Sequence, residues 1–241
     1  MYEPRFYREW IKDKDLVSFN VTVKETDLYI SAHSDLKTQA VSAIINCRNP
    51  LEEYIKNHPV FLTTLEPYPV DDNAPAIVKE MAQATGKMGV GPMAAVAGAI
   101  AAAVGKALLA YSPEVIVENG GDIYMKITRK RLVGIYAGDK SPFTGKIALE
   151  IQPDDTPLGI CTSSKTVGPS LSFGETDATI VVSPSAALAD AAATAIGNRV
   201  KSYYDIDKEI EQVHLIAGLT GVVIIKDDRI GIWGNIKIVP L

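Results

Sequence analysis

The segment ADAAATAIGN, residues 189–198, carries a carboxylate and a hydroxyl at a spacing that could hold a metal ion. Asp190 and Thr194 stand at positions i and i+4, so both side chains project from one face if the segment is helical. Oxygen atoms side by side suit a hard divalent cation such as Mg²⁺, which keeps several of its own waters. The alternative is an ordinary helix in which Asp190 interacts with the amino-terminal dipole and Thr194 has no role. Spacing alone favours neither of these two interpretations over the other.

A pair of glycines follows a strand-like apolar run at 115–118, in the tetrapeptide Asn119-Gly120-Gly121-Asp122. Glycine lets the backbone approach a ligand closely or adopt a positive φ, and Asp122 could hydrogen-bond a hydroxyl group. All four residues are therefore candidates for contact with a cofactor. The simpler alternative, which the tetrapeptide alone favours, is a turn or bulge between two strands.

A glycine-rich break, KMGVGPMAA at residues 87–95, leads into a helix rich in small residues. Unpaired amides at a helix start bind phosphate well, and Gly91-Pro92 is a suitable start. Gly89 and Gly91 are therefore candidates for contact with a nucleotide. The break is not a Walker loop, because no Gly-Lys-Ser/Thr follows it. Glycines that allow helices to pack closely are the alternative, and this segment alone favours it.

The segment GICTSSKTVGPS, residues 159–170, places a thiol beside hydroxyl groups and a cation. Cys161 ends an apolar strand, and Thr162, Ser163 and Lys165 follow it. A nearby cation and exposed amides would lower the pKa of the thiol and make it a usable nucleophile or sulfur carrier. The alternative, slightly favoured, is a buried cysteine that behaves as a small hydrophobic residue.

The second cysteine, Cys47, lies late in an amphipathic helix and is a weaker catalytic candidate. With two cysteines in 241 residues no disulfide framework is expected, and both thiols should be reduced. The amino-terminal residues MYEPRFYREWIKDKD contain no apolar stretch of the kind that a signal peptide needs. We therefore expect a cytoplasmic protein.

Charge and hydropathy argue against two classes of partner, nucleic acid and membrane. Lys and Arg number 24 against 29 Asp and Glu, a formal net charge of −5, and no dense basic run occurs, so nucleic acid is disfavoured. The stretch 93–111 is rich in Ala and Gly and contains Lys106, which makes it a poor membrane span. A closely packed buried helix is the better interpretation.

The elements that must position these residues alternate irregularly between strands and helices. Apolar alternation and turn residues predict a hairpin over 16–31, and Ser34 or Asp35 could cap a helix running to about residue 46. Pro50 fits the first turn of a short second helix. The remaining expected helices lie at 76–85, 93–111, 187–196 and 206–217, and the remaining strands at 115–118, 123–128, 132–137, 146–151, 178–182, 221–225 and 229–238, with a short strand reaching Cys161. Without a strict βαβ rhythm, this order predicts a single α+β domain over 1–241 with largely antiparallel sheets.

The order of these motifs resembles that of the ApbE (FAD:protein FMN transferase) superfamily. Its members carry a glycine-led helix, a GGD turn, an ATSG strand end and an ADA-x-ATA helix in the same order. The counterparts here are Gly89–Ala110, Gly120–Asp122, Cys161–Ser163 and Ala189–Ala195, inside a core spanning 86–198. The chain is also similar to an ApbE-like family of archaea and bacteria that lacks signal peptides and has been linked to sulfide assimilation and homocysteine formation.

The resemblance implies a T-fold-related architecture, FAD or FMN as ligand and Mg²⁺ as metal. In the transferases, FAD is cleaved and FMN passes to a Thr or Ser of a target protein. Asp190 and Thr194 match the metal ligands, and the GGD turn and glycine-led helix match the surroundings of the nucleotide. The sequence departs from the pattern in its interval SSKTVGPSLSFGETD, which has neither the histidine nor the Asp-Pro of active transferases, and in Cys161, which replaces an alanine.

Three hypotheses follow for the function. The first is an accessory role in sulfur assimilation, in which Cys161, with Cys47, handles sulfide or persulfide beside a flavin- or nucleotide-binding cleft. The second is a Mg²⁺-dependent FAD:protein FMN transferase or FAD pyrophosphatase. The third is a ligand-binding module without turnover. The expected partners are a small molecule, a protein substrate or sulfur-transfer partner, and a second copy of the chain, with no nucleic acid and no membrane.

Overall fold

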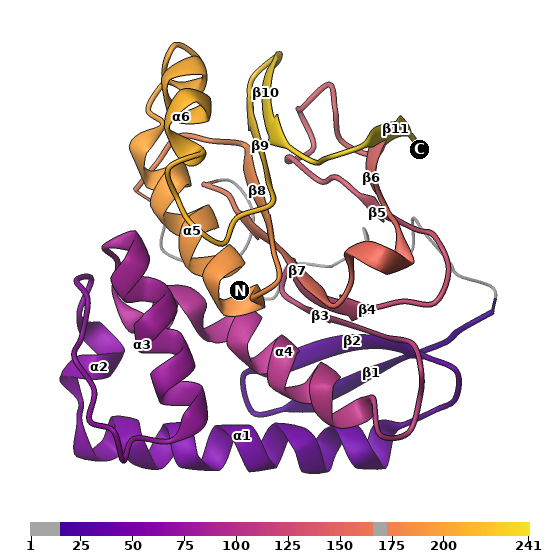
Figure 1. Ribbon diagram of the computed structural model, residues 1–241, viewed down its shortest axis with the longest axis vertical. Helices are drawn as coiled ribbons and strands as arrows, with labels where there is room; N and C mark the ends of the chain where they lie inside the picture. Colours follow the sequence, from indigo (N-terminus) through magenta and orange to yellow (C-terminus); the bar gives the residue numbers. More distant parts are fainter. Residues whose placement is uncertain (1–14, 166–172) are drawn as a thin grey trace.

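The structure, a computed structural model, describes residues 15–165 and 173–241. Strands and helices mix along the chain (Figure 1). In chain order they are β1 (Val17–Val23), β2 (Thr26–Ala32), α1 (Lys37–Asn57), α2 (Val60–Thr63), α3 (Ala76–Met88), α4 (Val96–Leu108), β3 (Val115–Asn119), β4 (Asp122–Lys126), β5 (Arg131–Gly134), β6 (Ile147–Ile151), β7 (Leu158–Ser163), β8 (Ala178–Ser183), α5 (Ala186–Arg199), α6 (Asp205–Val213), β9 (Gly221–Lys226), β10 (Arg229–Gly234) and β11 (Ile238–Pro240).

An eight-stranded sheet divides the molecule into two layers. Its order is β1-β2-β3-β4-β7-β8-β9-β10, and every neighbouring pair is antiparallel. The helices cover one face, and a three-stranded antiparallel sheet, β11-β6-β5, lies over the other (Figure 1). The α+β class with largely antiparallel sheets is thus confirmed.

Two separate hydrophobic cores form on the two faces of the large sheet, because successive side chains of a strand point to opposite faces. On β4, Tyr124 belongs to the core beneath the helices and Met125 to the core beneath the small sheet. On β7, Cys161 faces the helices and Ile160 faces the small sheet. Each central strand therefore contributes to both cores.

A group of three ionised side chains, two of them buried, joins the two sheets. Arg131 of β5 is 4% exposed and donates through Nε to Glu114, which precedes β3 and is fully buried. Its other guanidinium nitrogens donate to both carboxylate oxygens of Asp15, at 2.8 Å each. A bidentate guanidinium–carboxylate pair combines geometric specificity with strength.

Helix α1 corrects one expectation, because it is continuous where a short second helix beginning at Pro50 was expected. Ile44 before the proline, and Leu51 and Tyr54 after it, are all buried against the same core. The stabilisation gained by packing this continuous apolar face outweighs the loss of the backbone hydrogen bond that Pro50 cannot donate. Asp35 accepts from the Lys37 amide at the start of the helix, 3.0 Å away.

The carboxyl-terminal segment corrects a second expectation. A single strand was expected over 229–238, but the chain forms β10 in the large sheet and β11 in the small one. Gly234, the last residue of β10, has φ = 91°, a conformation that glycine adopts without strain and that ends the extended run. The segment thereby connects the two sheets.

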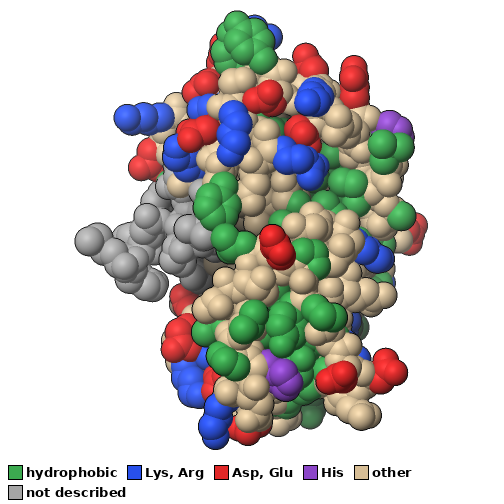
Figure 2. Space-filling view, turned by 90° about the vertical axis from the view of Figure 1, so that its left-hand side faces the viewer, with side chains coloured by type: hydrophobic (Ala, Val, Ile, Leu, Met, Phe, Trp, Pro, Cys, Tyr) green, Lys and Arg blue, Asp and Glu red, His purple; other side chains and the backbone are tan. Residues whose placement is uncertain are grey.

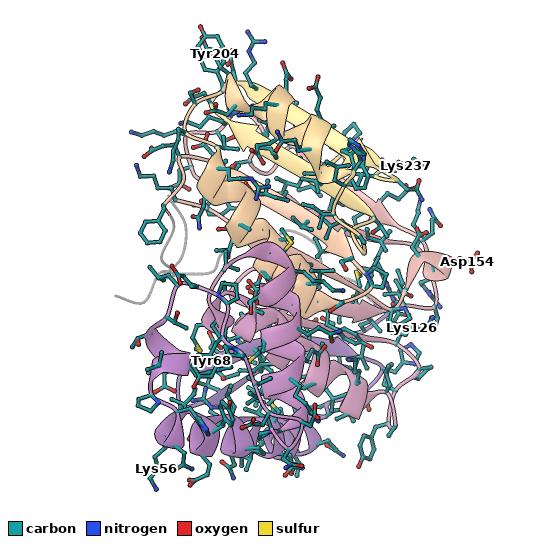
Figure 3. The ribbon with its side chains drawn as sticks, turned by 60° about the vertical axis from the view of Figure 1, so that its left-hand side comes forward. Lys56, Tyr68, Lys126, Asp154, Tyr204 and Lys237 are labelled. Atoms are coloured by element: carbon teal, nitrogen blue, oxygen red, sulfur yellow. The ribbon has the colours of Figure 1, made fainter. Side chains whose placement is uncertain are left out.

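The face formed by α2 and its neighbours carries exposed apolar side chains (Figure 2). Val60, Leu62 and Leu65 are 58%, 49% and 59% exposed. Phe61 of the same helix is fully buried, and Tyr68, which is labelled in Figure 3, packs edge-on against it. The two ring centroids are 5.6 Å apart. In the described ranges no single helix is long and apolar enough to span a membrane. Helix α3 and residues 92–108, which meet at a bend of 104°, have the length and composition of a membrane span only when they are counted together.

Helices α4 and α5 approach so closely that only glycine fits at their contact. A Cβ on Gly98 would lie 2.4 Å from the carbonyl oxygen of Ala186 and 3.0 Å from the Cβ of Asp190. On the other side of α5, a Cβ on Gly159 of β7 would lie 2.3 Å from the Cα of Ala186. Helix α5 is therefore held between α4 and the sheet at backbone contact distance.

We expect Gly98→Ala to destabilise the protein by about 1–3 kcal/mol, because the added methyl group overpacks this contact. Glycine to alanine inside a helix otherwise stabilises by up to about 1 kcal/mol. Gly86→Ala in α3 is the matched control, since a Cβ there meets no atom within 4 Å. The measurement is the midpoint of urea unfolding. Equal shifts for the two variants would show that the contact is not tight.

Candidate functional site

A pair of carboxyl groups lies where α5, α4 and the β3–β4 hairpin meet. Asp190 of α5 reaches across to the first turn of α4, where its Oδ2 accepts a hydrogen bond from the Gly98 amide at 2.9 Å. The Ala97 amide is a second donor to the same carboxyl group. Asp122, the first residue of β4, is the other member of the pair and is 8% exposed.

Burial and mutual repulsion hold protons on this pair. Burial raises the pKa of Asp190 to about 7, against the opposing effect of the Gly98 and Ala97 amides. Burial, and then the negative charge of Asp190, raise the pKa of Asp122 well above its usual range. Two carboxylates that share a site cannot both ionise without cost. At neutral pH the pair therefore favours a state with at least one proton.

The tetrapeptide from Asn119 to Asp122 forms a two-residue hairpin loop. Asn119 pairs with Asp122, and Gly120 and Gly121 have φ values of 69° and 102°. Tight hairpins of the I′ type require a positive φ at both central residues, so the turn itself explains both glycines. The side chains on either side add contacts: Asn119 donates to the Ala97 carbonyl at 3.1 Å, and Glu118 accepts from the Gly121 amide at 2.7 Å. The hairpin end is thus attached to the start of α4.

Cys161 lies directly beside Asp122. Its thiol is fully buried, is hydrogen-bonded to Asp122 and donates to the carbonyl of Ala186 at 3.3 Å. Burial, and then the charges of Asp122 and Asp190, raise the pKa of this thiol well above its usual range. Its burial and raised pKa agree with the alternative of a buried cysteine that behaves as a small hydrophobic residue. Lys165 forms an ion pair with Glu175.

Cys47 is isolated from this cluster in α1, half-buried, with its thiol donating to the Ile44 carbonyl at 3.2 Å. Burial raises its pKa to about 11. A protonated thiol is a poor nucleophile at neutral pH. Neither cysteine has the environment of an activated thiolate.

The remaining predicted site residues lie at varied places. Thr194 is half-buried one turn after Asp190 on α5, and Ser163 is half-buried at the end of β7. Gly89 ends α3 with φ = 70°. Gly91 packs so closely on the loop after α2 that a Cβ would lie 1.9 Å from the Thr64 carbonyl oxygen. The presence of glycine at both positions is therefore explained by the fold itself.

The structure also contains a cavity of about 180 Å³ between the two sheets, on the face opposite the carboxyl pair. Three predicted residues, Gly120, Gly121 and Thr162, contribute to its lining. Glu118 and Ser164 also line it and were not predicted. In the sequence, Glu118 and Ser164 are marked only by their alternation with Asn119 and Ser163. This alternation indicates a place in the cavity lining only once the position of the facing sheet is known. The other lining residues are Tyr29, Ser31, Ile116, Ile123, Met125, Leu132, Val133, Gly134, Ile135, Tyr136, Leu149, Ile160 and Ile180.

The described ranges contain no cluster of three or more His, Cys, Asp or Glu side chains that could hold a metal ion. Asp190 and Asp122 are thus a two-carboxylate site at most. A cation bound there would need further oxygen ligands from hydroxyl groups, carbonyl groups, water or a substrate.

Comparison with known proteins gives concordant results. A family model described as AbpE bacteria matches residues 8–214. A UPF0280 protein of Methanocella arvoryzae is 43% identical over 215 residues, which cover 89% of this chain and 87% of the relative. A UPF0280 protein of Methanothrix thermoacetophila is 47% identical over 199 residues, covering 82% and 83%.

Solved structures share the fold at low sequence identity. The flavin transferase ApbE from Vibrio cholerae matches with a TM-score of 0.57 and 13% identity, over 90% of this chain and 96% of that chain. The ApbE protein from Thermotoga maritima matches with a TM-score of 0.58 and 12% identity, over 87% and 94%. With the fold, the motif order and the family model in agreement, the chain belongs to the AbpE bacteria family, together with the UPF0280 proteins, and has the fold of the ApbE flavin transferases.

Proposed function

We propose that this protein is an enzyme of the flavin transferase type, which binds FAD with a divalent cation and cleaves its pyrophosphate. The FMN moiety would pass to a hydroxyl group of a protein or to water. The observation that carries the proposal is the carboxyl pair, Asp190 and Asp122, held at the start of α4. The resemblance of the fold to flavin transferases supports the choice of substrate.

The electrostatics of the pair favour a cation. Burial raises the pKa of each carboxyl group, so a positive charge placed beside the pair would stabilise the ionised forms. A divalent cation would supply that charge and allow both groups to ionise. Mg²⁺ commonly binds through one or two carboxylates, with substrate phosphates and water completing its shell. Asp190, Asp122 and the hydroxyl of Thr194 fit this donor set.

The chain's own residues would position the reacting groups. The Gly98 amide orients Asp190, and Thr162 donates its amide to Oδ1 of Asp122 at 3.1 Å. Because both carboxyl groups are held by backbone amides, little reorganisation is needed when a phosphate arrives. The cation would neutralise the pyrophosphate charge so that attack on phosphorus becomes feasible.

We expect the protein to release AMP from FAD when Mg²⁺ is present. Asp190→Asn should lower the rate at least about 100-fold, the order of effect seen when one electrostatic group is removed from a reacting centre. Asp154→Asn is the control, since Asp154 lies exposed on a distant turn (Figure 3) and should leave the rate unchanged. Absence of both AMP and a flavinylated acceptor protein, with Mg²⁺ or Mn²⁺, would refute the proposal.

The carboxyl pair also predicts a pH dependence of stability. The pKa of Asp190 is about 7 in the folded protein, against 3.8 for an ordinary aspartate. Between these values the folded protein binds more protons than the unfolded chain, so the free energy of unfolding should fall as pH rises from about 4 to about 7. The loss should be a few kcal/mol at most, since a tenfold change in acid dissociation corresponds to about 1.4 kcal/mol.

Asp190→Asn should flatten this pH dependence, measured by urea unfolding in EDTA. Asp154→Asn should leave the slope as in the wild type. Adding Mg²⁺ to the wild type should restore stability at pH 8 more than at pH 5. A slope that is the same in wild type and Asp190→Asn would show that Asp190 ionises normally.

A second candidate is an accessory role in sulfide assimilation and homocysteine formation that uses Cys161, with Cys47. The contact of Cys161 with Asp122 favours it, because the thiol lies within the proposed site. The raised pKa of both thiols counts against any step that needs a thiolate at rest. A sulfur-transfer step would require a conformation in which Cys161 is exposed.

The two thiols should therefore react slowly in the folded protein. With Ellman's reagent at pH 8, we expect each to react more than about tenfold more slowly than free cysteine, because the thiolate is the reactive form. Both should react at once in guanidinium chloride. Testing Cys47→Ser and Cys161→Ala separately would show which cysteine gives each kinetic phase of the reaction. Fast reaction of Cys161 in the native protein would favour the sulfur role.

A further inference from the structure

We propose that the outer edge of β10 pairs with β10 of a second copy of this chain, antiparallel across a two-fold axis, so that the two large sheets become one continuous sheet. The inference is independent of the proposed function, because it concerns the far end of the large sheet. Strands β7, β8 and β9 lie between β10 and Asp122 of β4, so the pairing keeps the carboxyl pair of each copy away from the interface.

β10 is the last strand of the large sheet, and among the described residues it pairs only with β9. The hairpin between them has a two-residue turn, and Arg229 belongs to the residue pair that closes it. The closing pair of such a hairpin exchanges hydrogen bonds, and bonded pairs then alternate with non-bonded pairs along the strands. The Asn235 amide, which donates to the Thr220 carbonyl at 3.0 Å, fits the same alternation. The amide and carbonyl groups of Ile230 and Ile232 therefore point away from β9, toward the open edge.

The apolar side chains of β10 pack against the cores of their own chain, except at Ile232. Ile230 packs against the core beneath the small sheet, and Trp233, on the other face, packs against the core beneath the helices. A Cβ on Gly231 would lie 2.4 Å from Cγ2 of Ile206, so α6 rests directly on this glycine. Ile232 shares the face of Ile230, because the two residues are two positions apart on the strand, but it is 45% exposed.

The sequence of β10 lacks the residues that protect an edge strand from pairing. Natural edge strands are commonly protected by lysine, proline or a bulge. β10, with the sequence RIGIWG, has no lysine and no proline, its pairing with β9 is continuous, and its one charge, Arg229, stands at its start. β1, at the other edge of the sheet, instead exposes the polar side chains of Ser18, Asn20 and Thr22. The apolar side chain exposed on β10 therefore makes this edge the better one for a partner strand.

The strand is complementary to itself when the two-fold axis passes beside Gly231. In that register Ile232 exchanges backbone hydrogen bonds with Ile230 of the partner subunit and packs against its side chain, once on each side of the axis. Arg229 lies opposite Trp233 of the partner subunit, which suits a guanidinium group over an indole ring. A two-fold interface uses the same surface of both copies, so one complementary strand provides both halves.

The surface beside this edge has the composition of a protein interface. Tyr203 and Tyr204, just before α6, are 37% and 76% exposed, and Tyr204 projects at the end of the molecule (Figure 3). The Arg229 guanidinium stands over the Tyr203 ring, 5.7 Å from its centroid. Tyrosine, tryptophan and arginine are enriched in protein interfaces. In the proposed register Trp233 of the partner subunit arrives beside this Arg229–Tyr203 pair, so the ring contacts extend across the interface.

The full chain should form a reversible dimer with a dissociation constant of about 1–100 µM, because the edge of one short strand makes a small interface. Sedimentation equilibrium measures this constant. Ile232→Lys should weaken the dimer at least about tenfold, since a two-fold interface contains the new charge twice. Thr22→Lys is the matched control, an exposed strand position at the opposite edge of the sheet, and should dimerise like the wild type.

Ile232→Pro separates backbone pairing from side-chain packing. Proline removes an amide that points to the open edge, so the hydrogen bonds to β9 remain and the monomer should stay folded. The dimer should be lost, and the midpoint of urea unfolding at low protein concentration shows whether the monomer is intact.

Disulfide cross-linking tests the register. Hydrogen-bonded pairs of antiparallel strands have Cα atoms about 5.5 Å apart, within the range of a disulfide. An oxidised mixture of Ile230→Cys and Ile232→Cys chains should give a covalent dimer on a non-reducing gel, and each variant alone should give much less. A wild-type chain that stays monomeric at about 200 µM would overturn the proposal, even if β10 binds a strand of another protein. So would a dimer that Ile232→Lys leaves intact and Leu62→Lys disrupts, because the interface would then lie on α2.

Discussion

The contact between Asp190 and the Gly98 amide depends on an unusually close approach of two helices. Helix α5 consists largely of alanine, and a Cβ at either Gly98 or Gly159 would collide with its backbone at Ala186. The carboxyl group of Asp190 is short, so it reaches the α4 amides only at this separation. Small residues bury less apolar surface than large ones would, but here they allow the carboxyl group of Asp190 to reach a defined position. The proposed chemistry needs that placement more than it needs any single neighbouring side chain.

The large sheet separates two environments that share the same strands. Toward the helices it presents Asp122 and Cys161, and toward the small sheet it presents Ile123 and Thr162. Because successive side chains of a strand point to opposite faces of the sheet, residues that are neighbours in sequence lie in different environments. A register slip of one residue would exchange the two sets, so the pairing of β4 with β7 determines which side chains lie near the carboxyl pair and which line the cavity.

Much of this arrangement could be predicted from local pattern. The alternation in β1 and β2, the turn chemistry of the NGGD tetrapeptide and the spacing of Asp190 and Thr194 are each read within a few residues. Other features could not be predicted, because they depend on distant partners. Pro50 continues a helix because of a buried face shared with Leu51 and Tyr54. The proximity of Asp122 to Asp190, the buried state of Cys161 and the place of Glu118 in the cavity lining all depend on the register between strands and the crossing of helices.

The ion group of Arg131, Glu114 and Asp15 has a consequence for how a molecule could reach the space between the sheets. Moving the small sheet away would leave the carboxylate of Glu114 buried without its guanidinium partner, at a cost of about 3–5 kcal/mol. Fewer than about one molecule in a hundred would be open in this way at any time. Entry by parting the layers would therefore be slow, and the end beside Gly121, where an added Cβ would meet no atom within 4 Å, offers the faster route.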